Sequence, residues 1–170
     1  MKGHKMNFAY KLHRFLFIIF LTLGTPYGLA VAEENTFLSN FQGEWQSDGD
    51  AFGQPAHSVM TWSLDLNDKF YRLNYNIITG TTPLLTGVAY YKETGAGQLK
   101  AFWADSTGDL HPITATFDGS ALVSIWGVEG EKLGRTRYEL ISPNQIQVTD
   151  WIMKDSDWRQ FNQNVFSKVE

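Results

Sequence analysis

Apolar and polar residues alternate with a period of two in short segments along most of the chain after residue 42. Residues 57–66 (HSVMTWSLDL) and 69–77 (KFYRLNYNI) show this alternation most clearly. A period of two is typical of a β-strand that buries one face. Asn67 and Asp68 join the two segments, and both residue types tolerate the positive φ that tight hairpin turns require. The pattern therefore predicts a β-hairpin here.

Further short segments with the same character follow, separated by turns rich in Gly, Asp, Asn and Ser. Asp118-Gly119 is a strong hairpin signal between two of them. No segment after the first 32 residues shows a helical stripe of useful length, although one short helical turn is expected within residues 35–42. The remaining predicted strands are residues 43–51, 84–92, 97–105, 113–117, 121–127, 133–141, 144–153 and 158–168.

Nine or ten short strands in series, each linked to the next by a hairpin, place the chain in the all-β class. A sandwich and a barrel both fit this spacing. The absence of an obvious long crossover favours a single antiparallel up-and-down β-barrel of about eight to ten strands, and closure also removes exposed strand edges. A barrel of that size has room inside for side chains and one small ligand.

The first 32 residues have the parts of a secretory signal. Phe15–Leu23 (FLFIIFLTL) is a short apolar core, Ala30-Val31-Ala32 fits a cleavage site, and the preceding basic residues are Lys2, Lys5, Lys11 and Arg14. A membrane-spanning helix needs about 20 apolar residues, so an uncleaved anchor is the weaker alternative. The sequence thus predicts a signal at 1–32, a barrel domain at 33–170 with no stable membrane anchor, and a periplasmic or secreted location.

The charge and the cysteine content limit the classes of partner and of covalent or metal bond that the protein can have. Four of the 14 basic residues lie in the predicted signal and all 18 acidic residues lie beyond it, so residues 33–170 carry a net charge of −8. Nucleic-acid binding needs clustered Lys and Arg, so nucleic acid is excluded as an expected partner. The chain has no cysteine. A disulfide and a cysteine-ligated metal are therefore both impossible.

Gly43-x-Trp45 opens the first predicted strand, and the segments around it strengthen this short motif. Residues 43–75, LTGVAYY, KAFWADSTG, LGRTRYEL and the aromatic closing segment together resemble lipocalin-like, calycin-type bacterial domains of unknown function. The resemblance spans roughly residues 41–168. It implies that Gly43 and Trp45 form a structural plug at the closed end of a barrel. It also implies that a late arginine, Arg137 or Arg159, stacks on the Trp45 ring.

The residues expected to face the barrel interior mix aromatic, aliphatic and polar groups, as a ligand cavity requires. For any single aromatic the simpler alternative is an ordinary core position. Arg137 is either an outward charge, the partner of Trp45, or a group that binds a ligand carboxylate. Leu64 and Leu73 share the expected inward phase, and Trp151 is an expected neighbour of these residues. The predicted ligand-binding residues are Met60, Trp62, Tyr71, Tyr75, Tyr90, Trp103, Trp126 and Arg137.

Catalytic and metal-binding motifs are sparse. His57 and His111 are the only histidines beyond the signal, no HExxH motif occurs, and neither histidine lies in the closing strands, where related barrels ligate haem. We therefore expect no metal site and no cofactor. Two carboxylate pairs could hold Ca²⁺ but fit solvated turns better, because no loop supplies the six or more oxygens that Ca²⁺ prefers; they are Asp48 with Asp50 and Asp105 with Asp109.

The sequence therefore predicts an exported lipocalin-like barrel that binds a small hydrophobic or amphipathic molecule in its interior. One alternative is a barrel enzyme of isomerase or hydrolase type that acts on a small hydrophobic substrate. The other is a structural or interaction module whose barrel is filled by its own side chains. A titratable group in a perturbed environment inside the cavity would distinguish the enzyme. The identity of the ligand and the oligomeric state stay open.

Overall fold

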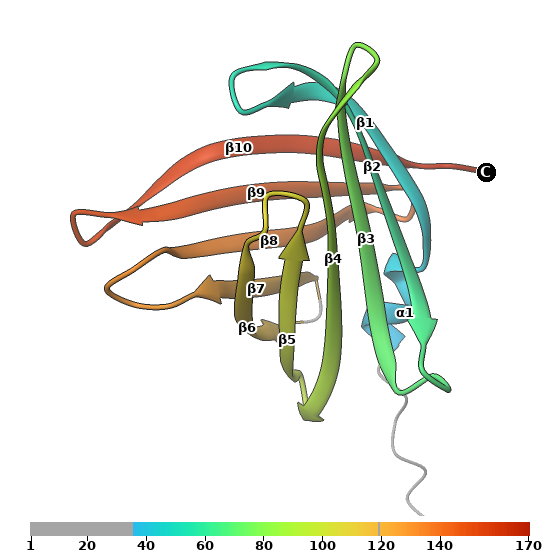
Figure 1. Cartoon of the computed structure of the whole chain (residues 1–170). Helices are drawn as coiled ribbons and strands as arrows, with labels where there is room; N and C mark the ends of the chain where they lie inside the picture. Colours follow the sequence, from blue (N-terminus) through green and yellow to red (C-terminus); the bar gives the residue numbers. More distant parts are fainter. Residues whose placement is uncertain (1–35, 119) are drawn as a thin grey trace, which may run out of the picture. The chain divides into compact units, whose positions relative to one another are not determined.

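The computed structural model describes residues 36–118 and 120–170, so the predicted signal lies outside the described residues. The described part belongs to one compact unit, residues 33–170. A short helix precedes ten strands (Figure 1). Their bounds are α1 Thr36–Phe41, β1 Gly43–Ala51, β2 Gln54–Asp65, β3 Phe70–Thr79, β4 Thr82–Gly95, β5 Gln98–Asp105, β6 Leu110–Phe117, β7 Ala121–Gly127, β8 Leu133–Ser142, β9 Gln145–Lys154 and β10 Asp157–Lys168.

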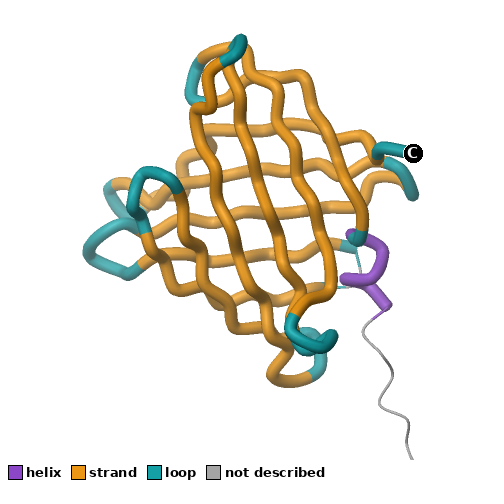
Figure 2. The backbone as a smooth tube through the Cα atoms, turned by 45° about the vertical axis from the view of Figure 1, so that its right-hand side comes forward, coloured by secondary structure: helices purple, strands orange, loops and turns teal. Residues whose placement is uncertain are grey.

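The ten strands form one closed antiparallel barrel. Each strand pairs with its neighbour in the sequence, and β1 pairs with β10 to complete the circle. Strands β2–β4 run across the direction of β8–β10, so the barrel is two layers of strands that continue into each other (Figures 1 and 2). The all-β, up-and-down barrel predicted from the alternating pattern is therefore confirmed.

The predicted hairpins form, although the first loop is longer than a two-residue turn. β2 ends at Asp65 and β3 begins at Phe70, and both Asn67 and Asp68 adopt positive φ, at 56° and 59°. The backbone N–H of Leu66 donates to the Asp65 carboxylate at 2.6 Å. Asn and Asp occupy the left-handed region at low cost, which explains why these residue types stand at this turn.

The closure between β1 and β10 is short and is extended by a side chain. The register pairs Trp45 with Lys168 and Gln46 with Ser167. Further along, the Asn164 side chain donates to the backbone carbonyl of Asp50 at 2.7 Å. The Asn164 amide thus joins β1 to β10 beyond the last backbone pair. This hydrogen bond limits the length of strand edge that would otherwise be exposed there.

A dense core fills the half of the barrel next to α1. Leu38 and Phe41 of the helix pack with fully buried Trp45 and Trp62, and the Phe41 and Trp62 rings lie 5.6 Å apart. The short helical turn expected before the first strand is confirmed as α1 and covers this end of the barrel (Figure 2). In the described part of the chain, no helix has the length and apolar character needed to cross a bilayer.

A β-bulge in β10 reverses which side chains face inward. The pairing with β9 shifts between Gln160 and Asn162, which leaves Phe161 as the extra residue. Before the bulge, Trp158 lies on the outer face under the Arg135 guanidinium. After it, Asn162 and Asn164 face the interior. An extra residue moves all later side chains to the opposite face, because the side-chain period of a strand is two.

Candidate functional site: an internal cavity

The half of the barrel away from α1 is hollow. Its cavity has a volume of about 470 Å³ and is lined mostly by apolar atoms. Ligand cavities in proteins commonly measure roughly 300–1,000 Å³, so the space can hold one small molecule. Aromatic side chains contribute much of the wall, and polar and charged side chains stand between them. The aromatic lining residues are Phe52, Tyr75, Tyr91, Trp103, Trp126, Tyr138 and Phe161.

Two tyrosines form the floor between the cavity and the dense core. The Tyr91 and Tyr138 rings lie 5.5 and 5.4 Å from the Trp62 ring beneath them. The Tyr91 hydroxyl bonds to the Ser124 hydroxyl at 3.1 Å. Burial raises the pKa of Tyr91 to about 12 and holds the pKa of Tyr138 well above its usual range. Both phenols are therefore neutral hydrogen-bonding groups at ordinary pH.

Asp150 of β9 is a partly buried carboxyl group that lines the cavity. Its Oδ1 accepts a hydrogen bond from the Thr136 hydroxyl at 2.6 Å, and its Oδ2 accepts one from the Asn162 amide at 2.9 Å. Burial raises the pKa of this carboxyl group, and the two hydrogen bonds offset only part of that rise. The charge of Asp150 also contributes to the raised pKa values of Tyr75, Tyr91 and Tyr138.

Two glycines make room for the two cavity tryptophans. The Trp103 indole occupies the space that a Cβ at Gly87 of β4 would need, and the Trp126 indole does the same over Gly134 of β8. Hydrogen bonds fix both rings: Trp103 Nε1 donates to Asp105 at 2.8 Å, and Trp126 Nε1 donates to the Thr136 hydroxyl at 3.1 Å. The glycines thus determine how far each ring stands back from the cavity.

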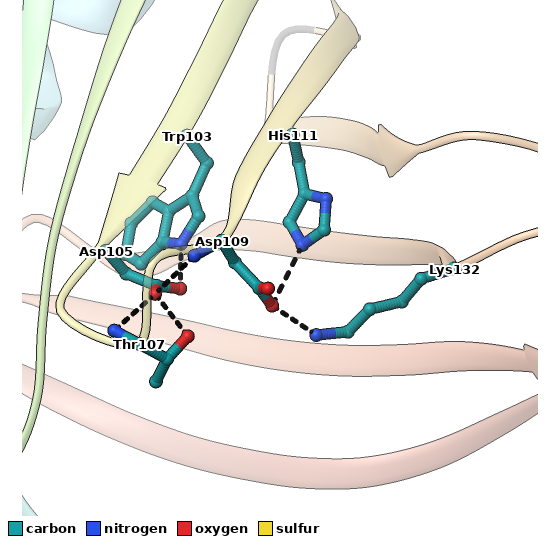
Figure 3. A network of polar contacts seen from close by, with 6 residues as sticks. All are labelled: Trp103, Asp105, Thr107, Asp109, His111 and Lys132. Atoms are coloured by element: carbon teal, nitrogen blue, oxygen red, sulfur yellow. Dashed lines mark hydrogen bonds and ion pairs between the residues drawn. The ribbon is translucent and has the colours of Figure 1, made fainter.

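A charged network joins two loops at the mouth (Figure 3). Asp109 Oδ2 lies 2.6 Å from Lys132 Nζ and 3.4 Å from His111 Nε2, which links the β5–β6 turn to the β7–β8 loop. The hydrogen bond and charge of Lys132 lower the pKa of Asp109. Burial acts to raise the pKa of Asp105, but hydrogen bonds from Thr107, Trp103 and Asp109 outweigh it, so that pKa is lowered too.

The predicted ligand-binding residues divide into groups by position. Tyr75, Trp103 and Trp126 line the cavity. Met60 and Trp62 are buried in the dense core below the floor, and Tyr71 packs against that core. The inward alternation expected for 57–66 and 69–77 is therefore correct, but it continues into a filled half of the barrel as well as a hollow one.

Three residues expected inside lie outside. Tyr90 bonds to Asp65 at 3.0 Å and stacks on exposed Phe102, while its neighbour Tyr91 points inward. Trp151 lies on the outer face under the Arg135 guanidinium, 4.2 Å from its ring centre. The inward placement of both aromatics was wrong because each is one residue out of phase with the buried face.

Arg137 is the third residue that lies outside, where its Nη2 is 3.1 Å from Glu139 Oε1. Residues 137 and 139 of β8 share the outer face, since inward positions alternate with them at Thr136 and Tyr138. A ligand inside the barrel is therefore out of reach of this guanidinium. Its role is a surface ion pair, which is the outward-charge alternative of the sequence analysis.

The predicted plug occupies the end of the barrel that α1 covers. Trp45 is fully buried, and its Nε1 donates to the Phe41 carbonyl at 2.7 Å. Gly43 has a φ of 119°, and a Cβ there would meet the Lys168 side chain. The cation on the Trp45 ring is Lys168, with Nζ 5.1 Å from the ring centre. The expected arginine was wrong: Arg137 pairs with Glu139, and Arg159 pairs with Asp155.

The histidines and carboxylate pairs form no metal-binding cluster within residues 36–118 and 120–170. His57 bonds to Asp48 at 2.8 Å on the outer face of β2. Of the two histidines in the described part of the chain, His111 reaches the cavity, where its ring lies 5.4 Å from the Trp126 ring. Asp50 accepts the backbone N–H of Gly53 at 2.9 Å, as expected for a turn carboxylate.

The sequence analysis missed the polar centre of the cavity: Asp150, Thr136, Asn162 and the tyrosine Tyr138. The signal for Asp150 is present, because Ile146, Val148 and Ile152 share its phase in β9 and an acid among them is an acid on the buried face. Asn162 could not be placed in the same way, since its inward position depends on the bulge at Phe161.

The closed up-and-down barrel with an internal cavity has a lipocalin-like fold. Among solved structures, the chain is similar to the S-type phycobiliprotein lyase CPES from Guillardia theta. The TM-score is 0.53 at 10% sequence identity, over 79% of this chain and 92% of that one. At this identity the likeness shows the fold alone. No family model and no curated protein sequence matches the chain.

Proposed function

We propose that this protein binds one small, partly apolar molecule inside its barrel. The observation that carries the proposal is the cavity of about 470 Å³, whose lining is mostly apolar and largely aromatic, with polar groups among the rings. Apolar walls with few polar groups are the composition of small-molecule sites, in which burial supplies affinity and the polar groups select orientation. The same cavity argues against a barrel filled by its own side chains.

The proposal includes export, with residues 1–32 removed and the barrel working in the periplasm or outside the cell. Its support is the basic start, short apolar core and Ala-Val-Ala site of the sequence. The barrel domain carries no cysteine, so it needs no oxidising compartment to fold.

The test is to express the full chain in a bacterium with two membranes, purify it gently from the periplasm, and record native and denaturing mass spectra. We expect a polypeptide of residues 33–170 with a stoichiometric small molecule that denaturation releases. Ile152→Trp fills the cavity, and Ile125→Trp places the same indole on the outer face of β7. The molecule should be lost from the first variant and kept by the second.

Two results would contradict the proposal. Retention of the molecule by Ile152→Trp at the level of Ile125→Trp would place the binding site outside the cavity. A protein that arrives empty and also binds none of three naphthyl probes (1-naphthylmethylamine, 1-naphthalenemethanol and 1-naphthoate) would remove the binding function altogether. A polypeptide that keeps residues 1–32 would overturn export while leaving binding intact.

One observation favours the enzyme alternative as a second candidate. Asp150 is a carboxyl group with a raised pKa inside the cavity, and such groups exchange protons with bound substrates in many active sites. The described residues offer no activated nucleophile there, since Ser124 bonds to Tyr91 and not to a histidine. Turnover would appear as a second small molecule in the same mass spectra, absent from Asp150→Asn.

A further inference from the structure

The polar groups of the cavity are asymmetric in charge. Three carboxylates line it, Asp105, Asp109 and Asp150, against one lysine and one histidine. The lysine is already committed, because Lys132 Nζ lies 2.6 Å from Asp109. Two of the three carboxylates, Asp105 and Asp150, therefore have no cation of the described residues against them.

Asp105 and Asp109 are satisfied by their own neighbours at the mouth. Asp109 has both Lys132 and His111 (Figure 3). The Asp105 carboxylate accepts four hydrogen bonds: from the hydroxyl and the backbone N–H of Thr107, from Trp103 Nε1, and from the backbone N–H of Asp109. Neither group needs a ligand to compensate its charge.

Asp150 differs from Asp109 because no cation of the described part of the chain lies against it, and from Asp105 because it accepts two hydrogen bonds where Asp105 accepts four. Thr136 and Asn162 each donate one hydrogen bond, one to each oxygen, and no ion pair within residues 36–118 and 120–170 joins Asp150 to a cation. A carboxylate can accept about four hydrogen bonds, so each oxygen keeps free acceptor capacity. An enclosed carboxylate without a counter-charge is costly for a protein to maintain.

The surroundings of Asp150 suit an organic cation. Trp126 contacts Thr136, the direct partner of Asp150, and three tyrosines lie close enough for the Asp150 charge to act on their pKa values. Aromatic faces attract an ammonium group through their quadrupole, and they do so more strongly away from water. The same rings contribute apolar area for the remainder of the molecule.

We infer that the ligand of this cavity is an aromatic or aliphatic molecule that carries a protonated nitrogen, and that this nitrogen lies against the Asp150 carboxylate. The inference rests on the proposed function, since it names the chemical class that the cavity binds. The ammonium group of the ligand is the counter-charge that no described side chain gives to Asp150. The tyrosine and tryptophan rings enclose the rest of the ligand.

The test compares three probes that share a two-ring aromatic body: 1-naphthylmethylamine, 1-naphthalenemethanol and 1-naphthoate, titrated at pH 7 by calorimetry. We expect the ammonium to bind about tenfold more tightly than the alcohol, through one charge-assisted hydrogen bond and ring contacts, and the carboxylate to bind weakest. In Asp150→Asn, which keeps the shape of the side chain, the ammonium and alcohol should bind alike.

The alcohol separates this inference from the proposed function and also reports whether a variant is folded. Equal binding of the ammonium and the alcohol by the unmodified protein, or strongest binding of the carboxylate, overturns the cation and leaves the cavity function intact. Binding of none of the three overturns both. Asp68→Asn is the matched control: it removes the same charge from an exposed turn and should keep the full preference for the ammonium.

Discussion

A carboxyl group enclosed inside a barrel changes how folding depends on pH, and Asp150 is such a group. Burial raises its pKa above the ordinary value of 3.8. In the pH interval between the unfolded and folded pKa values, the folded state binds more protons than the unfolded state. The free energy of unfolding contributed by this residue therefore falls as pH rises through that interval.

We predict that Asp150→Asn gains stability relative to the unmodified protein as pH rises above 3.8. The amide keeps the shape of the side chain but has no charge to bury. Urea unfolding at a series of pH values between 3 and 7 measures the difference in free energy of unfolding between the two proteins. This difference should increase with pH and then level off. The tyrosines around Asp150 do not interfere, because burial raises their pKa values from 10.0.

The control for this prediction is Asp68→Asn at the exposed turn. Its difference from the unmodified protein in free energy of unfolding should not show the same increase with pH. The comparison between variants is needed because Asp109 and Asp118 have lowered pKa values and contribute with the opposite sign. A difference for Asp150→Asn that shrinks with rising pH would show that the ionised carboxylate stabilises the empty barrel.

At the scale of the strand, the pairing of a glycine with a facing tryptophan sets the width of the cavity. Trp103 of β5 lies over Gly87 of β4, and Trp126 of β7 lies over Gly134 of β8. The absence of a side chain on one strand thus lets the indole ring of the adjacent strand lie flat against the barrel wall. Glycine within a strand often marks such a close approach.

We predict that Gly87→Ala narrows the cavity. The new Cβ would displace the Trp103 indole inward and strain its hydrogen bond to Asp105, because indole is too rigid to bend around a methyl group. Overpacking of this kind costs about 1–3 kcal/mol of stability. Binding of 1-naphthalenemethanol should weaken by about tenfold, since about 1.4 kcal/mol corresponds to that factor in a dissociation constant.

Gly95→Ala is the matched substitution for this prediction. Gly95 also lies in β4, and nothing stands within 4 Å of a Cβ placed there. Its probe affinity should equal that of the unmodified protein. Unchanged affinity in Gly87→Ala would mean that Trp103 can yield without entering the ligand space.

For the whole molecule, the division into a filled half and a hollow half depends on the plug at the α1 end. Trp45 is fully buried there with a hydrogen bond to Phe41 of the helix. It thereby joins the helix to the strands where β1 meets β10, and that junction is only two residue pairs long.

We predict that Trp45→Ala lowers the free energy of unfolding by about 3–5 kcal/mol, the usual range for truncation of a core tryptophan. Urea denaturation followed by circular dichroism measures it. Trp158→Ala removes the same ring from the outer face of β10 and should cost clearly less, because Trp158 is only partly buried against Arg135. Equal losses in the two variants would contradict the plug.

The sequence by itself determined the class of fold. Alternation with a period of two specifies strands with one buried face, and turn residues at short intervals specify hairpins in series. The same pattern correctly placed Tyr75, Trp103 and Trp126 on the inner face. These features are local, so they can be read without knowing which strands meet.

Only the tertiary structure decided where the cavity lies and what its polar centre is. In the Tyr90–Tyr91 pair, the two residues are chemically alike, and contacts with other strands decide which faces inward. The bulge at Phe161 carries Asn162 to the interior, where it meets Asp150. The position of an inward residue along the barrel axis decides whether it lies in the filled half or in the hollow half. That position depends on the register of all ten strands and on the helix that covers one end.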